Sequence, residues 1–151
     1  MDYYFSEITN AGFLYAVKKF PLLEDLELSH CYIEGLDLKV VGLSCPNLKT
    51  LKLNRKGWKL PRLEFDDDAL AIAETMPKLR HLQLCGNRLT DFGLNAILDN
   101  CLHLDHLDLR QCFNIDLVGD LEKRCFKSIK DVRLTYDSAA GYPINFDGIV
   151  D

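Results

Sequence analysis

One stretch decides the fold: residues 79–112, which read LRHLQLCGNRLTDFGLNAILDNCLHLDHLDLRQC. Within it the pattern L-x-x-L-x-L occurs twice, beginning at Leu79 and again at Leu104. The same pattern begins at Leu23 and Leu48, and an aliphatic variant begins at Ile129. Successive starts are therefore separated by 25, 31, 25 and 25 residues. A repeat of this length that carries this leucine pattern predicts a leucine-rich-repeat solenoid, in which each unit stacks on the next.

Each unit is predicted to contain one strand and one helix. Alternate leucines in L-x-L point to one face of an extended segment, so each unit begins with a short strand. In the unit that begins at Leu79, Thr90 or Asp91 is suited to start a helix, because either side chain can accept a hydrogen bond from a backbone N–H. Further helices are predicted over 36–44, 67–75 and 117–124. The expected fold is an α/β solenoid with a parallel, concave sheet and convex helices.

The whole chain, 1–151, is predicted to be one leucine-rich-repeat domain of about five repeats. A partial repeat covers 1–22, full repeats start at 23, 48, 79, 104 and 129, and a short tail covers 138–151. The second unit is longer than the others, and its excess lies in 55–64, which contains Trp58. An insertion there maps to a loop on the rim, which either contacts a partner or is a tolerated surface feature. Residues 8–13 resemble 89–94, so the chain begins inside a repeat.

The six cysteines are explained by the repeat rather than by disulfides. Four of them occupy two equivalent slots of different units: Cys31 with Cys112, and Cys45 with Cys101. Buried free thiols are expected in these slots, as in the cysteine-containing type of repeat, and Cys85 is expected to be exposed enough to react. Asn87 shares the slot of Cys112 and is expected to bond backbone groups of neighbouring turns. Free thiols indicate a reducing, intracellular setting, in the nucleus, the cytoplasm or both.

Signs of catalysis are few in this sequence. The net charge of −5 and the scattered basic residues argue against nucleic-acid binding, and no apolar stretch is long enough to span a membrane. His81 and His106 occupy the same slot of adjacent repeats, so their rings should lie about 5 Å apart. Two histidines without a third ligand make a poor metal site. We therefore expect no enzymatic activity, no metal and no cofactor.

A partner-binding surface is predicted where polar residues alternate with the strand leucines. The predicted partner-binding face consists of Tyr4, Asp25, Glu27, Lys52, Asn54, His81, Gln83, His106, Asp108, Arg110, Asp131 and Arg133. Its charges have both signs, which suits a protein ligand, although the same residues also suit a merely solvated surface. Tyr4, Arg110 and Arg133 are the expected anchors, because tyrosine and arginine are frequent in interface hot spots. Replacing Asp108 with alanine is expected to cost little stability, since this side chain should be exposed.

Three segments resemble a known family. Residues 67–84 (DDALAIAETMPKLRHLQL), 107–114 (LDLRQCFN) and 121–125 (LEKRC) are similar to plant F-box/leucine-rich-repeat proteins of the SKP1-interacting-partner type. The similarity runs through nearly the whole chain. It implies that an N-terminal F-box binds SKP1 and that the repeats hold a protein substrate for a cullin-based ubiquitin ligase.

The sequence departs from the family pattern because it contains no F-box before the repeats. The resemblance therefore implies the substrate-recognition part of an SCF-type ligase, a non-catalytic module in ubiquitin-dependent protein degradation. A protein substrate is expected on the concave face, and SKP1 is an expected partner only if an F-box lies upstream in the full-length protein. The alternative is a general protein-binding scaffold, or a degenerate fragment, unconnected to ubiquitin ligation.

Overall fold

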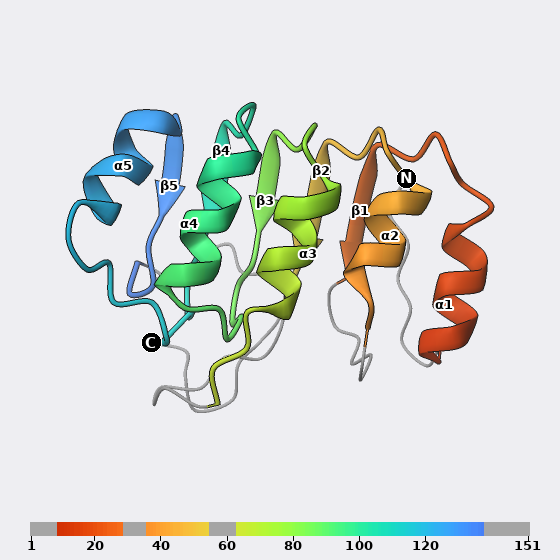
Figure 1. The fold of residues 1–151 in the computed structure, drawn as a ribbon, viewed down its shortest axis with the longest axis horizontal. Helices are drawn as coiled ribbons and strands as arrows, with labels where there is room; N and C mark the ends of the chain where they lie inside the picture. Colours follow the sequence, from red (N-terminus) through yellow and green to blue (C-terminus); the bar gives the residue numbers. More distant parts are fainter. Residues whose placement is uncertain (1–8, 29–35, 55–62, 138–151) are drawn as a thin grey trace.

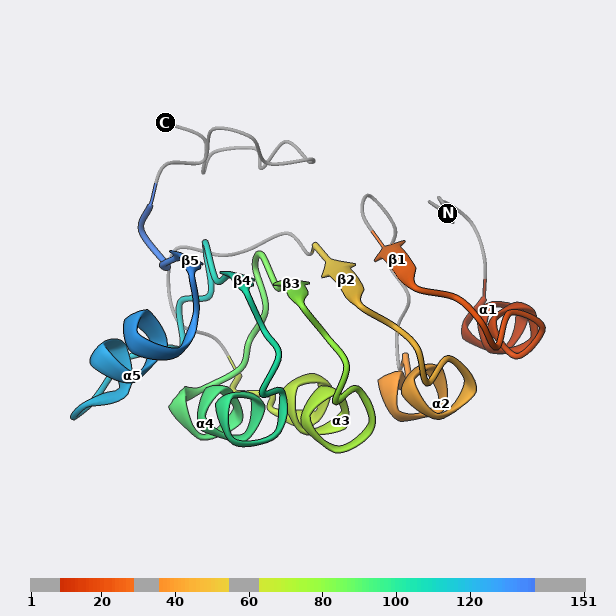
Figure 2. The same cartoon turned by 90° about the horizontal axis from the view of Figure 1, so that it is seen from above.

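The computed structural model describes residues 9–28, 36–54 and 63–137, and its strands form one parallel sheet. The strands follow chain order and are β1 (Asp25–Leu28), β2 (Thr50–Leu53), β3 (His81–Gln83), β4 (His106–Asp108) and β5 (Asp131–Arg133). The helices are α1 (Asn10–Val17), α2 (Leu38–Ser44), α3 (Asp67–Thr75), α4 (Asp91–Asn100) and α5 (Leu121–Ser128). All five helices lie on one side of the sheet (Figure 1). Figure 2 shows the strands on an inner arc and the helices on an outer arc. The α/β solenoid with a concave sheet is confirmed.

The strand register confirms the predicted spacing. Leu51 pairs with Leu26 on one side and with Leu82 on the other, although these neighbours are 25 and 31 residues away. Leu82 pairs in turn with Leu107, and Leu107 with Val132. The leucines of these rows are almost completely buried and form a continuous core between sheet and helices. The longer second unit therefore fits into the stack without shifting the register.

Several predicted features lie outside the described residues: Tyr4, Cys31, Trp58, nearly all of the insertion at 55–64, and the tail 138–151. The division of the chain into a partial repeat and five full repeats stays a prediction. Across the described ranges, no helix combines the length and the apolar character needed to cross a membrane.

Two helices begin as the internal similarity of the sequence predicts. The hydroxyl of Thr90 accepts a hydrogen bond from the Phe92 N–H at 3.3 Å, where α4 begins. The hydroxyl of Thr9, 81 positions earlier, accepts one from the Gly12 N–H at 3.1 Å, where α1 begins. Helix α3 has the predicted bounds, whereas α2 begins two residues later than predicted, after its N-cap Asp37.

The prediction for the last helix was wrong by four residues, because a helix was expected over 117–124 and α5 covers Leu121–Ser128. The carboxylate of Asp91 accepts hydrogen bonds from three successive backbone N–H groups, at 116, 117 and 118, over 2.8–3.0 Å. Leu117 and Gly119 have φ angles of 55° and 70°, in the left-handed region that interrupts a helix. This turn, held by a residue of the preceding repeat, delays the start of α5.

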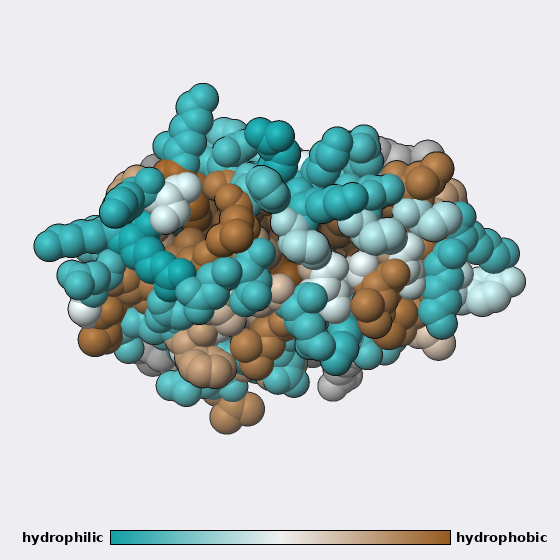
Figure 3. All heavy atoms as spheres, turned by 45° about the horizontal axis from the view of Figure 1, so that its top comes forward, coloured by the Kyte–Doolittle hydropathy of each residue, from teal (hydrophilic) through white to brown (hydrophobic). Residues whose placement is uncertain are grey.

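The outer side of the solenoid carries exposed apolar side chains from several helices. They include Tyr15 of α1, Leu43 of α2, Phe92 of α4 and Phe126 of α5. Polar groups separate the apolar ones on the side shown in Figure 3. Exposed apolar residues that are scattered in this way are normal for a folded protein.

Gly42 marks the closest approach of two neighbouring helices. A Cβ atom at this position would overlap the Oγ1 and Cβ atoms of Thr75 in α3. That hydroxyl donates a hydrogen bond to the Ala71 carbonyl at 2.7 Å, which fixes the threonine side chain. Gly42→Ala should therefore lower the free energy of unfolding by about 1–3 kcal/mol, as overpacking usually does. This loss is expected even though alanine favours helices more than glycine.

Urea unfolding followed by circular dichroism measures this effect. Leu43→Ala is the matched control, because the neighbouring leucine is exposed and its truncation should change little. A Gly42→Ala protein as stable as the unmodified chain would show that α2 and α3 are not in such close contact.

Candidate functional site: the concave side of the sheet

Two rows of side chains cross the strands on the concave side of the sheet. Strand residues between the leucines point away from the core, and the parallel register places equivalent residues beside one another. The histidine row consists of Asp25, Thr50, His81, His106 and Asp131. The lysine row consists of Glu27, Lys52, Gln83, Asp108 and Arg133. Neighbouring residues of one row lie about 4.8 Å apart, the usual distance between strands.

Two shallow hollows lie along these rows and share one residue, His81. The first, of about 280 Å³, is lined by Asp25, Leu26, Glu27, Thr50, Lys52 and His81. The second, of about 240 Å³, is lined by His81, Gln83, His106, Leu107, Asp108, Arg110, Asp131 and Arg133. Both are smaller than the roughly 300–1,000 Å³ typical of small-molecule sites. They are better suited to single side chains of an extended segment.

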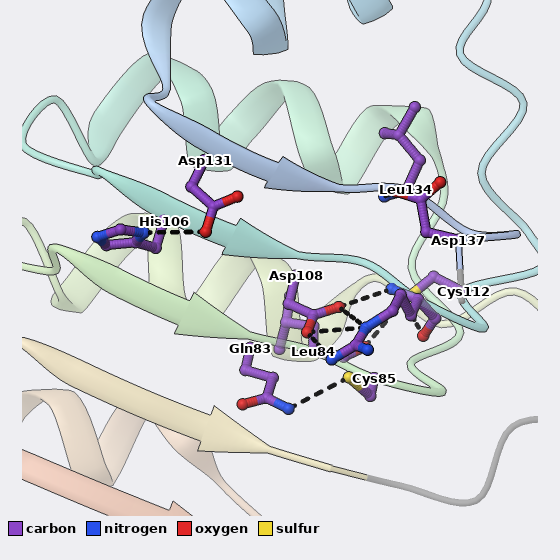
Figure 4. Close-up of polar contacts among 10 residues, drawn as sticks. Gln83, Leu84, Cys85, His106, Asp108, Cys112, Asp131, Leu134 and Asp137 are labelled. Carbon is purple, nitrogen blue, oxygen red and sulfur yellow. Dashed lines mark hydrogen bonds and ion pairs between the residues drawn. The ribbon is translucent and has the colours of Figure 1, made fainter. Parts of the chain in front are cut away.

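The two histidines of the row contact each other, as their equivalent positions predict. Their ring centroids are 5.3 Å apart and the ring planes are tilted by 35°. His106 Nδ1 lies 3.3 Å from a carboxylate oxygen of Asp131, as Figure 4 shows. Burial lowers the pKa of His81, and the positive charges of Lys52 and of protonated His106 lower it further. His81 is therefore a neutral imidazole at neutral pH.

The expectation that the Asp108 side chain is exposed is wrong. Only 8% of Asp108 and 4% of Arg110 is exposed. Arg110 donates from Nε to Asp108 Oδ1 at 2.9 Å and from Nη2 to Oδ2 at 2.6 Å. Asp108 Oδ1 also accepts the backbone N–H of Arg110 at 3.1 Å, and these bonds of Asp108 are drawn in Figure 4. Strand alternation assigns a side chain to one face, but it does not say how deeply neighbouring turns cover it. The pair is part of the lining of the second hollow.

The prediction that Cys85 is exposed enough to react is also wrong. Its side chain is fully buried, and Gln83 Nε2 donates to its sulfur at 3.5 Å. Burial, assisted by the negative charge of Asp108, raises the pKa of this thiol to about 12. Gln83 and Asn54, two residues of the predicted partner-binding face, are buried as well.

The accessible part of the predicted partner-binding face is thus smaller than expected. It consists of Asp25, Glu27, Lys52, His81, His106, Asp131 and Arg133, which are exposed or half-buried. Thr50 was not included in the prediction, yet it lines the first hollow. Its position in the same row as His81 would have identified it, because the register places equivalent residues side by side.

The cysteine slots behave as predicted, whereas Asn87 does not. The thiol of Cys112 donates to the Leu84 carbonyl of the preceding repeat, and those of Cys45 and Cys101 are directed at carbonyl groups of the preceding helix end. All five described cysteines are free and buried. Asn87 bonds the Leu89 N–H within its own turn and the buried carboxylate of Asp68, rather than backbone groups of neighbouring turns.

The burial of the cysteine side chains predicts low thiol reactivity. Burial raises the pKa values of Cys101 and Cys125 to about 11 and that of Cys85 to about 12, so their thiolate fractions at pH 8 are very small. Because the thiolate is the reactive form, iodoacetamide should label these cysteines at least about tenfold more slowly in the native protein than in urea. Mass spectrometry of peptides from timed reactions measures the rates site by site. Rapid labelling of native Cys85 would contradict its buried position.

Comparisons with known proteins connect this chain to a family. No protein-family model matches the chain. The F-box protein SKIP19 of Arabidopsis thaliana is 66% identical to it over 133 residues, which cover 88% of the chain and 42% of that protein. Putative F-box/LRR-repeat protein 23 of the same plant is 64% identical over 87% of the chain and 29% of its own length. Putative F-box/LRR-repeat protein 21 is 56% identical over 93% of the chain and 51% of its own length. The chain thus spans about half or less of these relatives, and through its repeat region it belongs to the plant F-box/leucine-rich-repeat proteins.

Proposed function

We propose that this chain is the substrate-recognition part of an SCF-type ubiquitin ligase receptor, and that its concave side binds a segment of a protein substrate. One observation carries the proposal: the two rows present charges of both signs at regular intervals on a sheet held by a leucine core. The names of the relatives, which include F-box proteins, support the connection to ubiquitin ligation.

The geometry of the rows favours an extended protein segment as the ligand. The strands hold the rows at fixed spacing, so binding does not require the surface to become ordered first. Negative charge from Asp25 lies at β1, positive charge from Lys52 at β2, and both signs occur again at β5 with Asp131 and Arg133. Such a pattern selects a ligand of complementary charge order and rejects others. The chain itself has an adaptor role without catalysis.

SKP1 binding belongs to the longer protein in this proposal. The F-box is the segment through which proteins of this family are expected to hold SKP1, and the repeats are expected to hold the substrate. An intracellular location, in the nucleus or the cytoplasm, agrees with the five free thiols.

Affinity capture from plant cells with the chain as bait tests the role of the concave side. Asp25→Arg and Arg133→Glu each reverse a charge on an exposed residue of the rows, and Lys123→Glu does the same on the outer helix α5. Substrates held on the concave side should be recovered about tenfold less with the first two variants, as expected when a contact worth more than 1.4 kcal/mol is lost. Recovery with Lys123→Glu should be unchanged. Equal recovery with all three would contradict the proposal.

The connection to ubiquitin ligation needs a separate measurement. The chain is compared with a form that carries an F-box joined to its N-terminus. SKP1 should co-purify with the second form, and the captured substrates should be ubiquitylated only with that form. If substrates are captured but SKP1 and ubiquitylation are absent from both forms, the chain is a general binding scaffold.

A further inference from the structure

Gln111, in the turn that follows β4, has two features that cost stability. Its φ angle is 60°, in the left-handed region that residues other than glycine rarely adopt. Only 7% of the residue is exposed, and its amide oxygen Oε1 is buried with no hydrogen-bond partner in the described part of the chain. A strained backbone and an unpaired buried polar atom both weaken a fold. The stability of the solenoid therefore gives no reason for a glutamine at this position.

The preceding repeat has a glycine at the equivalent position. Gly86 lies 25 residues before Gln111, has a φ angle of 75°, and donates its N–H to the Arg110 carbonyl at 3.0 Å. Gln111 donates its own N–H to the Thr135 carbonyl of the next repeat at 2.8 Å. The two turns thus have the same backbone conformation and the same bond to the following repeat. Glycine adopts this conformation without strain, so the turn itself does not require a side chain.

The side chain of Gln111 is held by packing rather than by hydrogen bonds. Within the described ranges its amide forms no hydrogen bond, and the bond to Thr135 comes from the backbone. A change of rotamer therefore breaks no hydrogen bond, whereas a rotamer that meets a ligand gains one. Tyr136 occupies the equivalent position of the next repeat and is 82% exposed. A side chain at this point of a repeat can thus reach the surface.

Gln111 also lies next to the second hollow. It directly follows Arg110, which lines that hollow together with residues of β3, β4 and β5. A hollow of about 240 Å³ accommodates one side chain of an extended segment, so the backbone of that segment lies at its edge. The amide of a glutamine is suited to pair with a backbone, because its oxygen accepts an N–H and its nitrogen can donate to a carbonyl.

We propose that Gln111 is a binding residue of the concave side, whose side-chain amide turns toward the bound segment and accepts one of its backbone N–H groups beside the second hollow. This inference rests on the proposed function, since it names the residue that pairs with the backbone of the bound segment. Hydrogen bonds to a ligand backbone supply affinity for any sequence, while the pockets beside them select side chains. Gln111 would therefore fix the register of the segment, and the two rows would select its sequence.

Urea unfolding tests whether the amide of Gln111 has a structural role instead. Gln111→Met keeps a similar volume and removes the unpaired polar atoms, so it should unfold at the same urea concentration as the unmodified chain or at a higher one. Asn87→Leu is the matched comparison, because the buried amide of Asn87 does form hydrogen bonds, to Asp68 and to the Leu89 N–H. It should unfold at a lower urea concentration. A similar loss with Gln111→Met would overturn the inference.

A random peptide display library provides the probe for the binding experiment. It is selected on the whole chain, and peptides that lose binding to Arg133→Glu are kept as concave-side ligands. Fluorescence anisotropy of such a peptide should show about tenfold weaker binding to Gln111→Met and to Gln111→Gly, which corresponds to about 1.4 kcal/mol. Binding to Lys123→Gln, a variant of the outer helix α5, should be unchanged. Equal binding to the unmodified chain and to both Gln111 variants would overturn the inference.

Methylation of the peptide, one backbone nitrogen at a time, identifies the group that Gln111 binds. One N-methyl group should weaken binding to the unmodified chain about tenfold, yet have little further effect on binding to Gln111→Met, where the hydrogen bond is already absent. Losses that are the same for the two proteins at every methylated position would rule out a backbone N–H as the partner of Gln111.

Failure of the inference is distinguishable from failure of the proposed function. Peptides that depend on Arg133 but bind the Gln111 variants unchanged would end the inference and leave the concave side as the binding surface. A selection in which no peptide depends on any residue of the two rows would contradict both.

Discussion

Replacing Leu107 with alanine should lower the free energy of unfolding by about 2–5 kcal/mol, the usual range for a leucine truncated in a packed core. Leu107 is 1% exposed and lies between Leu82 and Val132 in the sheet. The smaller side chain leaves a cavity between layers, and the stacked strands can collapse into it only in part. Leu102→Ala is the control, because Leu102 is 78% exposed.

Urea unfolding of the two variants measures the difference directly. Each strand of the described sheet pairs only with its neighbours in sequence, so the damage should be concentrated in the layers next to β4. Amide hydrogen exchange should accordingly increase most at the backbone hydrogen bonds that join β4 and the residue after it to β5, such as the bond from the Leu109 N–H to the Arg133 carbonyl. Equal stability of Leu107→Ala and Leu102→Ala would contradict the placement of Leu107 in the packed core.

The periodicity of leucine predicts the layers of this fold for a direct physical reason. Each short strand can bury its leucines only by stacking on a neighbour in register, so residues such as Leu51 and Leu82 must coincide despite the longer spacing between them. The contact between His81 and His106 follows from the same rule, because equivalent positions of adjacent strands are neighbours. These features require only the repeat length, and they were predictable.

Features that depend on contacts between repeats could not be predicted in the same way. The late start of α5 depends on the Asp91 carboxylate, which belongs to the preceding repeat and holds the turn around Leu117. Nothing within residues 113–120 themselves indicates that partner. The hollows are another example, because their lining combines side chains from several strands at depths that periodicity does not define.

The largest error in the predicted site concerned how deeply its side chains are buried. The alternation that places Lys52 and Arg133 at the concave surface also placed Asp108 and Arg110 there as exposed residues. Asp108 and Arg110 instead form hydrogen bonds with each other, although they are only two positions apart in the sequence. A carboxylate followed two residues later by an arginine, at the end of a central strand, is compatible with either arrangement. The sequence alone therefore cannot separate a structural ion pair from two ligand-binding residues.

The ion pair between Asp108 and Arg110 is the basis of the second large effect on stability that we expect. Asp108→Ala should lower the free energy of unfolding by about 3–5 kcal/mol, because it removes the carboxylate that compensates a buried guanidinium. Arg110→Met should cost less, since methionine fills similar volume and the remaining carboxylate keeps its hydrogen bond from the backbone N–H of residue 110. The double variant, Asp108→Ala/Arg110→Met, should be more stable than Asp108→Ala alone, because it leaves no buried cation.

The double-mutant cycle separates this interpretation from a loss of packing. If the two residues act as an ion pair, the coupling energy from urea unfolding of the four proteins should exceed about 1.5 kcal/mol. Asp108→Asn adds a second test, because it keeps the shape and an acceptor oxygen but removes the charge. It should fall between the unmodified chain and Asp108→Ala. Additive losses in the cycle, with Asp108→Asn as stable as the unmodified chain, would show that Asp108 contributes hydrogen bonding alone and that its charge is free to act on a ligand.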